Sequence, residues 1–84
     1  MTKEIYQIEE EIFDLEVEKT QLEYRMKQQQ KVMEMLEKQD VRSGYMRARY
    51  DLASDAYCSL IKQIANIIDE INRAKRQLND KQTK

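Results

Sequence analysis

Apolar residues recur every three or four positions along most of the chain, and this spacing constrains the fold more than any other feature. One series runs from Ile5 to Leu36 and a second from Met46 to Leu78. Alternating steps of three and four place these side chains on one narrow stripe of an α-helix, which is the geometry of helix-on-helix packing. The alternation fails once, between the two series, where Gly44 lies. The spacing therefore predicts two long helices separated by a bend.

The composition favours the same fold. The 84 residues include no proline, one glycine and 37% charged residues, so the usual signals for turns and sheets are missing. We predict a single all-α domain over residues 1–84, capped at its start by Thr2. Helix 1 is expected at about 3–40, a bend at about 41–44, helix 2 at about 45–78 and a polar tail at 79–84.

The break in spacing coincides with Val41, Ser43 and Gly44, which favours a hairpin over one continuous helix with a phase slip. Charge favours antiparallel over parallel pairing of its helices. Eight acids and two lysines lie in residues 1–24, whereas the end of the chain is rich in lysine and arginine. Folding about Ser43 brings these segments together and stacks the two apolar series in layers, such as Leu15 with Ile71. The predicted hairpin seam comprises Ile8, Ile12, Leu15, Leu22, Met26, Met33, Leu36, Tyr50, Tyr57, Leu60, Ile64, Ile67, Ile71 and Leu78.

A second set of apolar residues falls outside this seam. A lone hairpin of this length buries little surface, so a widened apolar stripe is typical of a helix that contacts two neighbours. Scattered surface apolar residues are the simpler alternative, since they are common on soluble proteins. We predict that the hairpin forms part of a larger bundle with another helical protein or a second copy of itself. The candidate partner-binding residues are Tyr6, Phe13, Val17, Tyr24, Ile61, Ala65 and Ile68.

Residue types that support catalysis or cofactor binding are poorly represented. The chain has no histidine, so its acidic residues lack the Glu-x-x-His element of di-iron bundles. Cys58 has neither a histidine base nor a second cysteine. We therefore expect no enzymatic activity, no catalytic or metal site and no cofactor. Arg42, Arg47 and Arg49 surround the bend and offer phosphate contacts, but the chain carries a net charge of −1 and nucleic-acid binding is the weaker interpretation.

In architecture the chain resembles the small helical hairpins of bacterial type VII secretion, namely the Trp-x-Gly family and the accessory partners of Leu-x-Gly toxins. At the bend, however, Arg42-Ser43-Gly44-Tyr45 has the glycine without the tryptophan. The family's Tyr-x-x-x-Asp/Glu export signal is missing after helix 2, and Tyr6 to Glu10 matches it at the wrong end. The resemblance thus implies an accessory protein that relies on the export signal of its partner.

Together these features predict a non-enzymatic protein-interaction module that binds a helical partner as a chaperone, adaptor or targeting factor, with a type VII secreted toxin as one candidate partner. The alternatives are a structural homo-oligomeric coiled coil, of the phage or cytoskeletal kind, and a small nucleic-acid-binding regulator that uses the basic bend. No segment is apolar enough for a membrane span. We expect synthesis in the cytoplasm, with secretion alongside a partner as an open alternative.

Overall fold

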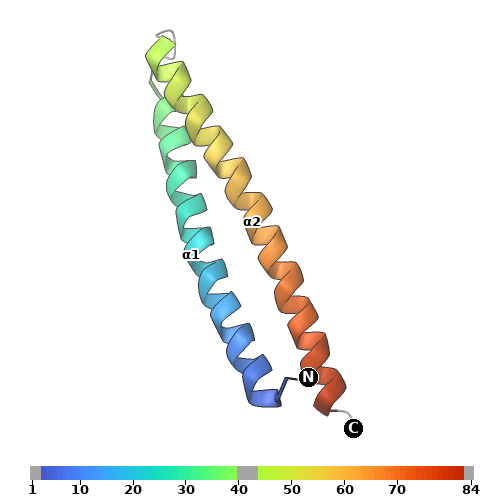
Figure 1. The fold of residues 1–84 in the computed structure, drawn as a ribbon. Helices are drawn as coiled ribbons and strands as arrows, with labels where there is room; N and C mark the ends of the chain where they lie inside the picture. Colours follow the sequence, from blue (N-terminus) through green and yellow to red (C-terminus); the bar gives the residue numbers. More distant parts are fainter. Residues whose placement is uncertain (1–2, 40–43, 83–84) are drawn as a thin grey trace.

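The computed structural model describes residues 3–39 and 44–82, which form two long helices, α1 (Ile5–Glu37) and α2 (Gly44–Gln82). The helices lie side by side and antiparallel, so both termini are at the same end of the molecule (Figure 1). The rod measures 63 × 17 × 15 Å. The predicted all-α helical hairpin is therefore confirmed.

The start of α1 is capped by Glu4, not by Thr2, which lies outside the described residues. The backbone N–H of Glu4 donates to Oε1 of Gln7 at 2.9 Å, and the N–H of Ile8 donates to the Glu4 carbonyl at 3.2 Å. The first bond uses an N–H that a helix start otherwise leaves unpaired, and the second is the first bond of the helix ladder. The first turn of α1 is thus stabilised locally.

The bend differs from the prediction at both of its edges. The first helix ends at Glu37 instead of about residue 40, because Gln39 donates its N–H to Leu36 in a tighter bond of 3.2 Å. Gly44, placed by the prediction in the bend, is the first residue of α2 and does not have a positive φ. Residues 41–43, which make up the rest of the predicted bend, lie outside the described residues.

The predicted polar tail at 79–84 is wrong for residues 79–82, which continue α2 to Gln82. No proline or glycine interrupts this segment. Lys81 also lies in the last turn, where a positive charge interacts favourably with the helix dipole. Polarity alone is therefore a poor signal for the end of this helix.

The hydrophobic core lies between the helices, nearer the termini than the bend. Leu22, Ile67 and Ile71 form a buried cluster, and the half-buried side chains of Leu15, Leu60 and Ile64 pack against it. Polar contacts also join the helices at the surface. The Lys75 ammonium lies 3.8 Å from the Glu16 carboxylate, and the Tyr50 hydroxyl donates to Glu37 at 3.0 Å.

Within residues 3–39 and 44–82, neither helix has an apolar stretch long enough to cross a membrane.

Candidate partner-binding surface

The residues assigned to the seam are all at least half-buried, although to different depths. Ile8, Leu22, Leu36, Ile67 and Ile71 are buried. The others are half-buried: Ile12, Leu15, Met26, Met33, Tyr50, Tyr57, Leu60, Ile64 and Leu78. Because two helices cannot surround a side chain on all sides, most of this seam stays partly open to further contacts.

The four candidate residues of α1 form an apolar stripe along its outer surface. Tyr6, Phe13 and Tyr24 are each more than 60% exposed, and Val17 is 42% exposed. The steps of seven, four and seven residues keep them on one side of the helix. We call these four residues the α1 stripe.

Shallow hollows separate the side chains of the α1 stripe. One is lined by Phe13, Glu16, Val17, Thr20 and Gln21, and the next along the helix by Thr20, Gln21, Tyr24, Arg25 and Gln28. Exposed rings alternating with hollows are the surface on which a second helix packs its own side chains.

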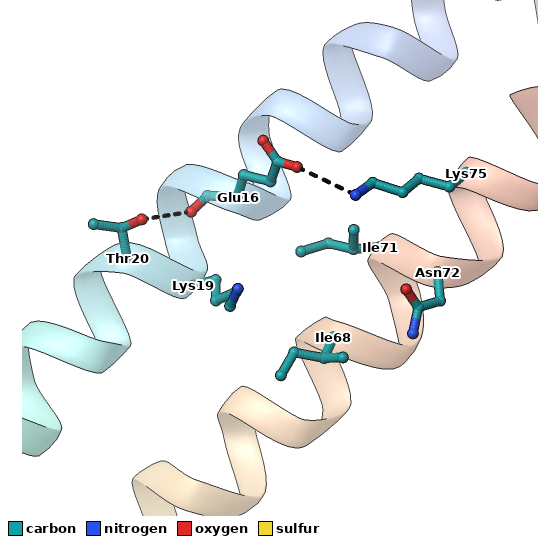
Figure 2. Close-up of a pocket in the computed structure, with 7 residues that line it drawn as sticks. All are labelled: Glu16, Lys19, Thr20, Ile68, Ile71, Asn72 and Lys75. Atoms are coloured by element: carbon teal, nitrogen blue, oxygen red, sulfur yellow. Dashed lines mark hydrogen bonds and ion pairs between the residues drawn. The ribbon is translucent and has the colours of Figure 1, made fainter.

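The candidate residues of α2 lie beside the seam on one flank of the hairpin. Ile61 and Ile68 are 44% and 39% exposed, and Ala65 is also exposed. On this flank Glu16 and Lys19 of α1 extend toward α2 (Figure 2), and with Thr20 they line one pocket together with Ile68, Asn72 and Lys75 of α2. We call this flank, from Ile61 to Lys75, the Glu16–Lys75 face. It adjoins the α1 stripe, because Glu16 and Thr20 line hollows in both.

A pocket in the Glu16–Lys75 face opens between the two helices. Ile68 and Ile71 supply apolar side chains, and Lys19, Thr20 and Asn72 supply polar ones (Figure 2). The Thr20 hydroxyl donates to the Glu16 backbone carbonyl at 3.0 Å, so its own bonding is satisfied within α1. Glu16 and Lys75 are both more than half exposed, which leaves both free to bind further groups. This mixture suits the side chains of another helix.

Two exposed apolar residues escaped the sequence interpretation. Leu52 is 70% and Met35 61% exposed. With Val32, Arg49 and Ala56, Leu52 lines a shallow groove. Val32 and Arg49 take the heptad position opposite to that of Glu16 and Ile68, so the groove lies on the other side of the seam. The residues that share the heptad position of Val32 and Arg49 in the two helices would have indicated this groove from the sequence.

The bond between Tyr50 and Glu37 also escaped prediction, because Tyr50 was assigned to the apolar seam. The phenol donates to the Glu37 carboxylate at 3.0 Å. This hydrogen bond, followed by repulsion between the carboxylate and a phenolate, raises the pKa of Tyr50 above its ordinary value of 10.0. The pair joins the two helices at the bend end of the hairpin.

The other candidate sites considered in the sequence are a metal site, the Cys58 thiol and the basic residues near the bend. Among residues 3–39 and 44–82, no three acidic or thiol side chains come together in a way that would hold a metal ion. Cys58 is a free, exposed thiol. Near the bend, the Arg49 guanidinium lies 5.9 Å from the centre of the Tyr45 ring, whereas Arg42 lies outside the described residues.

No protein-family model, curated protein or solved structure matches this chain. Its function is therefore argued from the surface described above.

Proposed function

We propose that this protein is a non-enzymatic interaction module, a helical hairpin that binds a helical partner as a chaperone, adaptor or targeting factor. The α1 stripe carries the proposal. Phe13 and Tyr24 are about 65% exposed, and burying such aromatic rings is a main source of free energy in protein–protein contacts. Their one-sided spacing favours a partner that is itself a long amphipathic helix.

The charges around the α1 stripe indicate which kind of helix it would bind. Acids flank the α1 stripe, among them Glu9, Glu10, Asp14 and Glu16, and these four are exposed. A partner helix with lysine or arginine beside its apolar residues would complement this charge. The hairpin format and the resemblance to type VII accessory proteins make a secreted toxin's helical targeting segment a specific candidate.

Affinity capture from the native host tests the proposal with matched variants. Tyr24→Asp should remove the bound partner, because it places a charge in the middle of the stripe. Met35→Asp is the control, since Met35 is an equally exposed apolar residue of α1 outside the stripe. Equal capture by both variants and the wild type would contradict the proposal. Far-UV circular dichroism of each variant checks that the hairpin stays folded.

A further inference from the structure

The hairpin exposes more surface than a protein of its mass usually does. Its accessible area is 6835 Å² for 10.2 kDa, whereas a compact monomer of that mass exposes about 5,300 Å². The excess of about 1,500 Å² is about twice the area, about 800 Å², that each partner buries in a standard protein–protein interface. A contact of the size found in obligate homodimers, about 3,000 Å² over both partners, would therefore bring each chain to the burial expected of a folded domain.

The Glu16–Lys75 face is well suited to that contact. It presents Ile61 and Ile68 from α2 and adjoins Phe13 of the α1 stripe, because Phe13 lines a hollow together with Glu16 and Thr20. Two hairpins packed together through this face would enclose these residues between four helices, which is the usual way in which helical hairpins bury a widened apolar stripe.

Charge indicates which kind of partner fits this face. Near the termini, α1 is strongly acidic: residues 3–24 hold eight acids and two lysines. In α2, residues 62–82 hold five bases and three acids. A second copy placed with its α1 over α2 would match each acidic segment with a basic one, twice over.

The Glu16–Lys75 pair makes this match specific. The two groups are 3.8 Å apart and more than half exposed, so the pair is loose within one chain (Figure 2). In a two-fold arrangement with both bends at the same end, every residue keeps its height along the rod. Lys75 of each copy is then level with Glu16 of the other. Four charges of alternating sign would surround the centre of the interface.

We propose that two copies of this chain pack through the Glu16–Lys75 face, in the same direction, as a four-helix bundle in which α1 of each copy lies on α2 of the other. This inference rests on the proposed function and names a partner for the face that adjoins the α1 stripe. The pocket between Ile68, Ile71 and Lys75 receives side chains from the second copy. By the level of the Glu16–Lys75 pair, Thr20 of that copy lies beside it.

A charge exchange tests the pairing in solution. Glu16→Lys and Lys75→Glu should each weaken the homodimer by about tenfold, because each collects four like charges at the centre of the interface. Mixing the two variants should restore association as a heterodimer, since every contact between copies is again between opposite charges. Sedimentation equilibrium measures both effects. Failure of the mixture to associate more tightly than either variant alone would overturn the proposal.

Apolar variants test whether this face is the one buried. Ile68→Asp should convert the dimer to a monomer. Leu52→Asp should leave the dimer intact, because Leu52 is an exposed apolar residue on the other side of the seam. Circular dichroism verifies folding in both. Loss of the dimer in both variants, or in neither, would contradict the assignment to the Glu16–Lys75 face.

Spin labels test the direction of packing. Ala48 is exposed on α2 near the bend, and Ala48→Cys in a Cys58→Ser background gives one label per chain. Labels at the same end of the bundle should lie within about 30 Å of each other. A reversed arrangement centred on the same face would separate them by about 60 Å, at 1.5 Å per residue. A distance of that larger size would overturn the proposed packing.

These outcomes separate the inference from the proposed function. A wild-type chain that stays monomeric at all concentrations overturns the second copy as partner, while capture of another protein that depends on Tyr24 would still support the interaction module. A dimer with the charge behaviour described above supports the inference even where the capture experiment finds no other protein.

Discussion

The two ends of the hairpin hold their helices together in different ways. Toward the termini, isoleucine and leucine dominate the seam and form the cluster of Leu22, Ile67 and Ile71. Toward the bend, the seam consists mainly of methionine, glutamine, tyrosine and alanine, and buried residues there are Leu36 and Ala53. A side-chain hydrogen bond, from Tyr50 to Glu37, supplements this weaker packing.

This difference predicts an uneven distribution of stability along one continuous pair of helices. Branched aliphatic side chains pack densely with few conformations to lose, whereas methionine is flexible and glutamine brings a polar group into the seam. The end near the termini should resist unfolding, and the end near the bend should open first. The candidate partner surface lies along the more stable half, where a rigid support favours binding.

The largest expected effect on stability comes from placing a charge in the buried cluster of Leu22, Ile67 and Ile71. Ile67 is 6% exposed, so Ile67→Asp buries an unpaired carboxylate at a cost of about 3–5 kcal/mol. We expect loss of the cooperative helical fold, measured by far-UV circular dichroism. Asn66→Asp is the control, because Asn66 is exposed on the same helix. A folded Ile67→Asp hairpin would show that this cluster does not hold the helices together.

Truncations at the two ends compare them directly. Ile71→Ala should cost about 2–4 kcal/mol, since Ile71 is buried in the cluster. Met33→Ala should cost about 1 kcal/mol, because Met33 is half-buried and its surroundings lose less contact. Urea denaturation of both variants measures the free energies of unfolding. Equal losses in the free energy of unfolding would contradict the proposed difference in stability between the two ends.

Replacing a polar residue near the bend by an apolar one should make the packing at that end more like the packing near the termini. Gln29 is half-buried and continues the heptad spacing between the seam residues Met26 and Met33. Gln29→Leu should raise the free energy of unfolding by about 0.5–1 kcal/mol through added apolar burial. Gln30→Leu provides the comparison, because Gln30 is exposed. A Gln29→Leu hairpin less stable than the wild type would indicate that the amide has a structural role in the seam.

A substitution at the start of α2 should also increase the stability of the hairpin slightly. Gly44 is helical, has no positive φ and leaves open space around an added Cβ. Gly44→Ala should therefore stabilise the hairpin by about 0.5 kcal/mol, chiefly by restricting the unfolded chain. The urea midpoint measures this shift. Destabilisation would mean that the connection between the helices needs glycine at this position.

The smallest effect is a pH dependence at the bend end. The raised pKa of Tyr50 means that the folded state favours the neutral phenol. Its contribution is complete below the ordinary value of 10.0 and is lost as pH rises through the raised pKa. Thermal unfolding of wild type and Tyr50→Phe should therefore differ at neutral pH and converge in alkaline solution. A difference that is the same at every pH would contradict this account.

The hairpin and its two-helix organisation were predictable from the sequence because heptad spacing depends on local helix geometry alone. The exposed positions of the α1 stripe followed from the same spacing. The helix ends were harder to predict. Glu4 replaced Thr2 as the cap, and α2 continued through a polar segment, because capping and end effects differ by about 1 kcal/mol or less.

The sequence by itself determined that two long amphipathic helices must form and that apolar residues must remain outside their seam, since periodicity places each residue on a helix face. The tertiary structure decided which faces lie next to each other. It brought Glu16 beside Lys75 and Tyr50 beside Glu37, and it opened the pocket over Ile68 and Ile71. Such contacts join residues far apart in the chain, and they depend on the axial alignment of the two helices, which local spacing does not specify.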